Sequence, residues 1–310
     1  MYRFLYSIYY IRFHSKRLDW LFLKLYIRIF NVVIPVYFRL TSFRKKYRLT
    51  DVQHIREIKY VVSLTTFPER IENVWLVIET ILRQKTKPDV IILWLYEGEF
   101  PDKNFLPGKL LNLEKRGLQI RFCDDNLMPH KKYYYTLQAF PNANIITIDD
   151  DFFYPVNLIR NLLSYHERYP KSICCTRSRE IKISQGCIQS YQKWPNIKVN
   201  TEPSYKYLTM GGGGTLFPPF SLSAETLNRD AIKEFALTAD DLWLKVMSLL
   251  NKTKVGCLGG EYPRVPIPIR NKSGSKLMDK NISLGQNDII FSSLIKKYNI
   301  PVYVFDDEKN

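Results

Sequence analysis

The sequence predicts an α/β fold, in which a mixed, mainly parallel sheet is flanked by helices and preceded by a basic, aromatic, helical N-terminal extension. Beyond residue 57, short runs rich in β-branched residues alternate with longer segments of helical apolar spacing, as in βαβ units. The chain has 310 residues, 45% of them hydrophobic, which is enough for a large core. No linker-like stretch follows residue 50, so we expect an extension at 1–56 and one domain at 57–310.

The extension carries much of the positive charge. The whole chain has a formal net charge of +16, and residues 1–50 contain eleven lysines and arginines but a single acid, Asp19, a local net charge of +10. Because the charge is concentrated there, nucleic acid is not the expected partner. The bases are interleaved with aromatic residues, a mixture that suits the headgroup region of an anionic membrane.

The apolar stretch 18–38 raises the question of a membrane span. Lys24 and Arg28 interrupt it, and Pro35 would kink a helix. Arg17 shares one helical face with these two bases. We therefore expect the extension to lie on the membrane, and the protein to be cytoplasmic and peripheral on the inner membrane face. The alternative is that the aromatic side chains pack on the main domain while the bases are solvated. A cleaved signal peptide is not expected, since no small-residue cleavage site follows.

The five cysteines and four histidines argue against two common kinds of site. The cysteines are odd in number and form no CxxC pair, which favours a reducing compartment over a disulfide framework. None of the histidines stands at ligand spacing from a cysteine, so a structural zinc site is not expected.

Strands and helices are expected to alternate in the first half of the domain. The expected strands are 60–65, 90–95, 118–123 and 144–148. The expected helices are 71–84, 109–116 (ending at Gly117) and 130–140. A later amphipathic helix is expected to open near 237 and to run to about Leu250.

Three adjacent carboxylates, Asp149, Asp150 and Asp151, follow the strand expected at 144–148. Such a run is costly at the end of an apolar strand unless a cation or solvent neutralises it. If the chain stays extended, Asp149 and Asp151 face the same side and form a D-x-D pair. Their oxygens suit Mg²⁺ or Mn²⁺, completed by phosphates and water. The alternative is a solvated turn, or Asp151 or Asn157 as the cap of the next helix.

A second acidic pair, Asp240 and Asp241, stands at the start of the helix expected near 237–250. Thr238 and Asp241 have the spacing of a capping box, which would give Asp241 a role in helix initiation. A carboxylate at a helix N-terminus also stays ionised and can accept a proton from an incoming hydroxyl group. One box needs only one acid, which leaves Asp240 to explain.

Four successive glycines, Gly211–Gly214, lie between the two acidic motifs. They remove every side chain where another group must approach the backbone closely. The segment is not a phosphate-binding P-loop, because Thr215 is followed by Leu-Phe-Pro-Pro and the G-K-[ST] ending is missing. We expect it to line a ligand cleft, and a plain flexible loop is the alternative.

The order of these features resembles the GT-A (Rossmann-like) glycosyltransferases, particularly bacterial enzymes that assemble surface polysaccharides. Four segments carry the resemblance, which spans about 59–251: VVSLTTFPER at 61–70, the Asp149–Asp151 run, the Gly211–Gly214 segment and ADD at 239–241. The resemblance implies a nucleotide-sugar donor, a Mn²⁺ or Mg²⁺ cofactor, and a glycan or lipid-linked glycan as acceptor.

The resemblance also implies residue roles. The implied metal ligands are Asp149 and Asp151. The implied catalytic residues are Asp241, as the base for the acceptor hydroxyl, and Asp240. The implied donor-nucleotide contacts are Thr65, Thr66, Arg70, Lys131, Lys132, Asp149 and Asp150, although a solvated helix face is the alternative for one of the lysines. The implied sugar or acceptor contacts are Gly212, Gly213, Gly214 and Trp243.

One departure from the family pattern concerns the metal. Many GT-A enzymes have a later histidine as a further ligand, yet all four histidines of this chain precede Asp240. Either the carboxylate pair and substrate phosphates hold the metal alone, or a later residue substitutes. The candidates are Asn271, Asp279, Asn287 and Asp288.

The sequence as a whole predicts a metal-dependent glycosyltransferase that moves a sugar from a nucleotide sugar, with UDP as the expected nucleotide. A nucleotidyltransferase acting on a sugar phosphate is the first alternative and would release pyrophosphate. A non-enzymatic membrane or nucleic-acid binding protein is the second, but it leaves both acidic motifs unexplained. An inverting path needs a base such as Asp241 and a retaining path does not, so the stereochemistry stays open.

Overall fold

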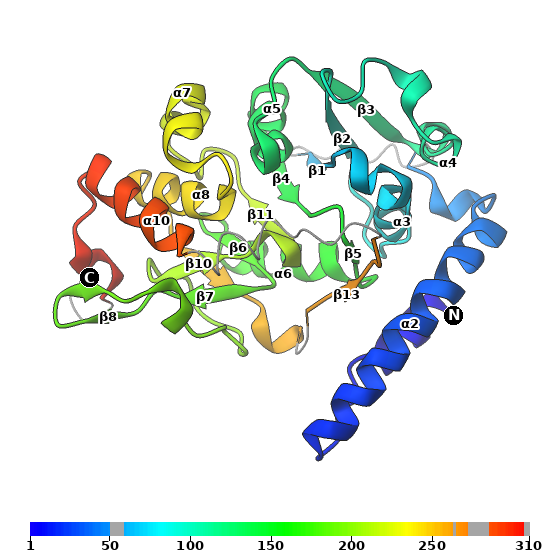
Figure 1. Cartoon of the computed structure of the whole chain (residues 1–310), viewed down its shortest axis with the longest axis horizontal. Helices are drawn as coiled ribbons and strands as arrows, with labels where there is room; N and C mark the ends of the chain where they lie inside the picture. The colour runs from blue at the N-terminus through cyan, green and yellow to red at the C-terminus, as the bar shows by residue number, and fades with distance from the viewer. Residues whose placement is uncertain (50–58, 263–264, 272–284, 307–310) are drawn as a thin grey trace.

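The protein is built around one large sheet, seen here in a computed structural model that describes residues 1–49, 59–262, 265–271 and 285–306. The expected boundary at 56/57 lies outside the described residues. The sheet has seven strands in the order β12-β6-β11-β4-β1-β2-β3. Strand β11 runs antiparallel to both neighbours, and the other neighbouring strands pair in parallel. The predicted mixed, mainly parallel sheet flanked by helices is confirmed (Figure 1).

The elements have the following bounds. The sheet contains β1 (Tyr60–Thr65), β2 (Val90–Tyr96), β3 (Leu118–Cys123), β4 (Asn144–Thr147), β6 (Ile173–Cys175), β11 (Thr215–Phe217) and β12 (Val255–Cys257). The longer helices are α1 (Tyr2–Ile8), α2 (Lys16–Thr41), α3 (Ile71–Leu82), α5 (Lys131–Ala139), α6 (Leu158–Arg168), α8 (Asp240–Leu250) and α10 (Gln286–Lys297). Small strand pairs outside the sheet are β5 (Phe152–Phe153) with β13 (Ile267–Pro268), β7 (Ser178–Glu180) with β10 (Tyr207–Thr209), and β8 (Ile183–Ser184) with β9 (Cys187–Ile188).

The strands expected at 60–65 and 118–123 have the observed bounds, and the other two expected strands differ at one end by one residue. The single helix expected at 109–116 is wrong. The chain forms a short helix, α4 (Gly108–Leu111), and a separate 3₁₀ turn at Glu114–Arg116. So short a segment has little helical stability of its own, and its tertiary contacts decide its shape. Gly117 ends the turn at a φ of 103°, which favours glycine.

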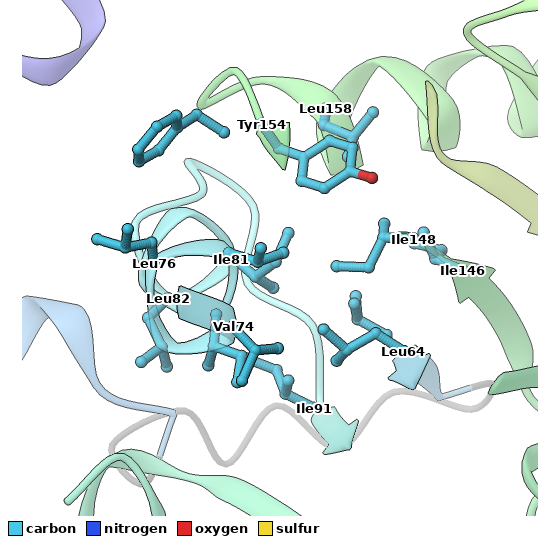
Figure 2. Packing of buried hydrophobic residues seen from close by; sticks show 14 of the residues in the cluster. Leu64, Val74, Leu76, Ile81, Leu82, Ile91, Ile146, Ile148, Tyr154 and Leu158 are labelled. Carbon is cyan, nitrogen blue, oxygen red and sulfur yellow. The ribbon is translucent and has the colours of Figure 1, made fainter. Parts of the chain in front are cut away.

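The core forms where α3 packs on one face of the sheet. Figure 2 shows Leu64 of β1 and Ile146 of β4 facing Val74 of α3. Because side chains alternate along a strand, Val62 joins the same cluster while Val61 joins a cluster on the opposite face. The near-continuous burial of β1 and β2 is therefore that of parallel strands covered on both faces.

Helices cover both faces of the sheet, which makes three layers. Side chains of α3, α6 and the N-terminal helices α1 and α2 belong to one hydrophobic cluster. Side chains of α5, α8 and α10 belong to a second cluster on the β6, β11 and β12 side. In Figure 1 the extension and α10 lie at opposite ends of the molecule.

The extension packs on the main domain through one side of α2 and through α1. Phe30 of α2 meets Phe153 of β5 with ring centroids 5.2 Å apart. The hydroxyl of Tyr2 donates to the carbonyl oxygen of Tyr154 at 2.6 Å, and that of Tyr6 to the carbonyl of Phe153 at 2.9 Å. Part of the aromatic set thus packs on the domain, while much of the apolar surface of α2 stays exposed.

A buried ionic cluster, formed by Glu79, Arg83 and Arg116 and called the Glu79 cluster below, ties the end of α2 to α3. Glu79 accepts hydrogen bonds from both terminal nitrogens of Arg116 and forms an ion pair with Arg83 at 3.2 Å. Arg83 also donates to the carbonyl of Phe38 at 3.2 Å and to the hydroxyl of Thr41 at 2.9 Å. The extension is therefore fixed to the domain by polar as well as apolar contacts.

Candidate active site

The three sequence motifs meet at one edge of the sheet because of the strand directions. Strand β4 delivers Asp149–Asp151 beyond its carboxyl end, where ligands bind in open α/β sheets. Strand β11 runs the other way, so the turn that precedes it, Gly211–Gly213, lies at that same edge. The register pairs Thr215 with Thr147, which brings the glycine turn beside the acidic run.

The acidic run is not an extended strand, so the alternation of side chains along a strand, from which Asp149 and Asp151 were expected to share one side, does not apply to it. Strand β4 ends at Thr147, and a turn follows at positions 150 and 151. Asp150 accepts from the hydroxyl of Thr66 at 2.5 Å and from Arg70 at 2.6 Å.

Arg70 is shared between neighbouring carboxylates. Besides its bond to Asp150, it lies 3.3 Å from an oxygen of Asp151. The loop after β1 thus holds the turn from one side, where Thr66 and Arg70 were expected to contact a nucleotide. Asn157 occupies the N-cap position of α6 but makes no capping bond with its side chain, so that alternative for the segment is not supported.

Lys132 joins the two acidic motifs. Its side chain is 4% exposed, and its ammonium group lies 2.7 Å from Asp149 Oδ1 and 2.8 Å from Asp240 Oδ2. Burial lowers the pKa of Lys132, but Asp149 and Asp240 outweigh burial and raise it well above its ordinary value. Lys132 is therefore a fixed cation, and residues about a hundred positions apart in the sequence share it.

Asp241 holds the glycine turn instead of capping its own helix. Its two oxygens accept from the backbone N–H of Gly211 at 3.0 and 3.2 Å. Helix α8 begins at Asp240 with Ala239 at the N-cap position, so Thr238 is not the N-cap residue that the capping-box alternative requires.

Glycine is required in this turn because other groups occupy the space of a side chain. A Cβ on Gly211 would lie 3.1 Å from Lys132 Nζ, 3.3 Å from Asp241 Oδ1 and 3.4 Å from Asp149 Oδ1. A Cβ on Gly212 would lie 2.8 Å from the ring of Phe152. The segment is thus a packed wall of the acidic site, and the flexible-loop alternative does not describe it.

The sheet-edge cluster, as we call Asp149, Asp150, Asp151, Asp240 and Asp241 together with Arg70, Lys132 and Arg177, contains more carboxylates than cations. Burial first, and Asp240 second, raise the pKa of Asp241 well above its ordinary value. Burial also raises the pKa of Asp150, and Arg70 offsets this only in part. Burial acts on Asp240 in the same sense, but Lys132 and His130 outweigh it and lower its pKa. The cluster therefore has spare capacity for a proton or a further cation.

Two residues that the sequence reading missed border the cluster. Tyr154 is fully buried, and its hydroxyl accepts from the backbone N–H of Asp149 at 2.9 Å. Arg177 follows β6, which runs in the direction of β4, so it reaches the same edge. Burial lowers the pKa of Arg177, while Asp241 and Asp149 act in the opposite sense. Recognising 173–175 as a parallel strand would have directed attention to the arginine just after it.

No hydrogen bond or ion pair engages the guanidinium group of Arg177 within the described ranges of the chain. Its side chain lies against the glycine turn, since a Cβ on Gly213 would be 2.7 Å from Arg177 Cγ. A largely buried guanidinium without a bonded carboxylate is costly. The cost falls when an anionic ligand binds beside it, which makes Arg177 a candidate ligand contact.

Several expected contacts lie elsewhere. The implied sugar or acceptor contact of Trp243 is wrong. Its side chain is fully buried in the core, and its N–H donates to the carbonyl of Thr226 at 3.2 Å, so it cannot touch a sugar. Thr65 donates to the carbonyl of Trp94 at 2.9 Å. Gly214, at a φ of 95°, packs against Leu158 of α6 and not against the carboxylates.

Lys131 is buried, so neither lysine of α5 occupies a solvated helix face. It donates to the side chain of Asn126 at 2.9 Å and lies 3.9 Å from Glu99, away from the bonded contacts of the sheet-edge cluster. A role for Lys131 at the diphosphate would require it to leave these partners.

Two of the residues suggested as a further metal ligand, Asn271 and Asp288, are bonded to other groups. Asn271 accepts from the side chain of Asn73 at 2.8 Å, and Asp288 accepts from the backbone N–H of Tyr191 at 2.6 Å. Asn287 is a buried residue of α10, and Asp279 lies outside the described residues. Among the residues that the structure describes, no group of three or more His, Cys, Asp and Glu side chains forms a ready-made metal site.

A separate pocket of about 550 Å³ lies between α6 and the segments 200–202 and 258–261. Its lining mixes exposed Arg160 and Arg168 with Glu202. The carboxylates of the sheet-edge cluster do not line it. The pocket and the sheet-edge cluster are therefore two separate regions of the molecule.

Comparison with known proteins places the chain among distant structural neighbours. No protein-family model matches it, and no curated protein matches it in sequence. It is similar to S. aureus TarS 1–349 in complex with UDP-GlcNAc, at 11% identity and a TM-score of 0.46, covering 82% of this chain and 74% of that one. For the same segment in complex with UDP, identity is 12%, the TM-score is 0.44, and 65% of this chain matches 58% of that one.

A third solved structure, UTP-bound UGPase from Acinetobacter baumannii, is 9% identical with a TM-score of 0.37, covering 77% of this chain and 94% of that one. At these values the similarities carry no weight for function. Function has to be inferred from the side chains at the sheet edge.

Proposed function

We propose that the chain is a glycosyltransferase that takes a sugar from a nucleotide-sugar donor, with the donor diphosphate at the sheet-edge cluster. The observation that carries the proposal is the convergence of Asp149, Asp240 and Asp241 around Lys132 and the Gly211 turn. These groups come from distant parts of the chain and lie where α/β sheets bind their ligands. Titratable groups whose pKa values are strongly perturbed by burial and by specific charged partners are candidates for function when they lie at such an edge.

A divalent cation fits this cluster by its chemistry. The donors are hard carboxylate oxygens, and burial first, with the neighbouring Asp240 second, raises the pKa of Asp241. We propose that Asp149 and Asp151 hold Mn²⁺ or Mg²⁺, with substrate phosphates completing the shell. When bound, the ion supplies positive charge against which a departing diphosphate is stabilised.

The chain's own cations have separate tasks in this proposal. Arg70 and Thr66 fix Asp150 and thereby the shape of the acidic turn. Lys132 keeps Asp149 and Asp240 in place. Arg177 is free of bonded partners among the described residues, so we assign it to the diphosphate, where it would stabilise the charge that develops on the leaving group.

Asp241 is the candidate base for the acceptor hydroxyl. Burial and the neighbouring Asp240 raise its pKa, which makes the ionised carboxylate a stronger base. Its bond to the N–H of Gly211 orients the carboxylate toward the acidic turn. A base in this position suits an inverting displacement at the anomeric carbon.

The acceptor is proposed to be a glycan or a lipid-linked glycan of a bacterial surface polysaccharide. A peripheral, cytoplasmic position on the inner membrane face would bring such an acceptor to the enzyme. The basic, apolar extension supports this placement.

The proposal is tested by incubating the protein with UDP-, GDP- and dTDP-sugars, with Mn²⁺ or with EDTA, and by identifying the released product. Release of nucleoside diphosphate that needs the metal and is lost in Asp151→Ala is the expected result. Asp230→Ala, an exposed acid of the short helix at Arg229–Ala231, is the matched control and should keep its activity. Pyrophosphate released from a nucleoside triphosphate and a sugar phosphate would instead establish a nucleotidyltransferase.

A further inference from the structure

The helix α2 exposes a continuous apolar stripe on the side that faces away from the domain. The members recur every three or four positions, as one face of a helix requires. They are Leu18, Leu21, Leu25, Ile29, Val32, Val36 and Leu40, each between 46% and 69% exposed. Most of the large exposed apolar side chains of the described residues lie in the first 43 positions. An apolar surface of this extent on a folded chain marks an interaction site.

The opposite side of α2 is already occupied. Phe30, Ile34 and Phe38 are at most 2% exposed and pack on the domain. The side chain of Asn31 donates to the carbonyl of Pro268 at 3.0 Å and accepts from the N–H of Arg270 at 2.9 Å. The helix therefore has one apolar side for the domain and another for a partner.

Basic side chains line one flank of the exposed stripe. At 100° per residue, Arg17, Lys24, Arg28 and Arg39 fall beside the stripe and not opposite it, and all four are exposed. The sole acid of residues 1–49 is Asp19, so the surface has little negative charge of its own. A second copy of the chain would bring two such basic surfaces together, whereas anionic lipid complements both the apolar stripe and the bases.

By length and composition alone α2 is also long and apolar enough to cross a membrane, with a mean hydropathy of 1.7 in its most apolar window. The helix is about 39 Å long and continues through Pro35. The part that precedes Phe30 is only about 21 Å long, however, which is less than a hydrocarbon core of roughly 30 Å. Crossing would pull the domain that is bonded to Asn31 into the bilayer, where its polar backbone would lose water.

We infer that α2 lies in the plane of an anionic membrane, with the stripe in the acyl boundary and the flanking bases at the headgroups. This deepens the peripheral placement in the proposed function. The observations that carry this inference all come from the extension, not from the sheet-edge cluster. The Glu79 cluster and the Phe30 contact fix α2 to the domain, so membrane binding would also orient the sheet-edge cluster relative to the lipid surface.

Membrane binding is tested by flotation with vesicles of phosphatidylcholine, with and without phosphatidylglycerol. The full chain should float with the anionic vesicles and respond to salt. Leu25→Gln/Ile29→Gln/Val36→Gln should weaken binding at least about ten-fold, since each change removes apolar burial. Arg17→Gln/Lys24→Gln/Arg28→Gln should weaken it by about a hundred-fold on anionic vesicles. Val199→Gln/Phe220→Gln, in which the altered side chains are exposed in the main domain, is the control that should bind normally.

Depth measurements separate lying from crossing. In a Cys187→Ser background, which removes the exposed cysteine, a fluorophore is attached at Leu21→Cys, Ile29→Cys or Leu40→Cys and quenched by brominated lipids. Equal, shallow depths are the expected result. A gradient through the bilayer centre would establish a span and overturn the inference, as would equal flotation of the stripe variant. A dimer in light scattering that the stripe variant loses would show that a second copy covers the stripe.

The same assay keeps this inference separate from the enzyme proposal. Asp151→Ala should bind vesicles like the wild type although it has no turnover. Turnover without vesicle binding would remove the membrane inference and leave the transferase standing.

Discussion

Two buried ionic clusters of this molecule use the same kinds of side chain but differ in how they are completed. In the Glu79 cluster, one carboxylate meets two guanidinium groups, and protein groups surround them: the carbonyls of Phe38 and Tyr47 accept hydrogen bonds, and the Tyr47 ring lies 4.0 Å from Arg83. In the sheet-edge cluster, five carboxylates meet three cations, and the side chain of Asp149 stays 33% exposed.

The difference distinguishes a structural cluster from a functional one. The Glu79 cluster lies inside the protein with one more cation than carboxylate, and it joins three segments: α2, α3 and the turn at Glu114–Arg116. The sheet-edge cluster keeps an excess of negative charge at an accessible strand end, an arrangement that costs stability unless a ligand compensates it. Both clusters hold unequal numbers of cations and carboxylates, so the exposure of the carboxylates and the sign of the excess charge distinguish them.

Removing Lys132 should have the largest effect. Lys132→Met leaves Asp149 and Asp240 without their shared cation, so we expect a loss of about 3–5 kcal/mol in the free energy of unfolding, measured with urea, together with loss of turnover. Adding Asp240→Asn should recover part of the stability, because it removes one unpaired charge. A single variant within about 1 kcal/mol of the wild type would contradict the bridging role.

Glu79→Gln should come next and should affect stability alone. Two buried guanidinium groups would lose their countercharge, which we expect to lower the free energy of unfolding by about 3 kcal/mol. Turnover per folded molecule should stay unchanged, as measured after correction for the folded fraction. A specific loss of nucleotide binding in this variant would erase the distinction between the clusters.

Lowering the pH should reduce the stability of the fold through His130, whose charge interacts with Asp240. Burial lowers the pKa of this histidine from 6.5 to about 4, so the folded state binds fewer protons than the unfolded state between these values. The stability is fully present above pH 6.5 and is lost as the pH falls toward 4, by about 2 kcal/mol between about pH 7 and 4.5. His130→Gln should reduce this dependence in urea unfolding, and an unchanged slope would show that other groups cause it.

Gly211→Ala should have the smallest effect on stability and a clear effect on activity. The added methyl group would press on Lys132, Asp241 and Asp149 at 3.1–3.4 Å, so we expect a loss of about 1 kcal/mol and at least ten-fold lower turnover. Gly108→Ala, where nothing lies within 4 Å of the added atom, is the control. Normal turnover in Gly211→Ala would remove the glycine turn from the active site.

Local signals in the sequence predicted much of the fold. The strands at 60–65 and 118–123 followed from β-rich runs, and the position of Asp149–Asp151 followed from the apolar strand before it. The predictions that failed concern features set by tertiary contacts. The chain turns at positions 150 and 151, beyond the end of β4, where Arg70 and Lys132 pair with the carboxylates, and neither contact is visible as a spacing in the sequence.

The same reason explains the errors around α8. Thr238 and Asp241 have the spacing of a local cap, but the N–H of Gly211, thirty positions away, competes successfully for Asp241. The resemblance implied a sugar or acceptor contact for Trp243, whereas the periodicity of the helix places this side chain in the core. Arg177 was missed because the short strand before it gave no clear pattern.

The most direct test of the central claim is a calorimetric titration of UDP into the protein with and without Mn²⁺, on the wild type, Asp149→Asn and Glu79→Gln. If the sheet-edge cluster binds the donor diphosphate with a metal, binding should need Mn²⁺, persist in Glu79→Gln and disappear in Asp149→Asn. Equal binding in all three proteins, or binding that only Glu79→Gln loses, would contradict the account.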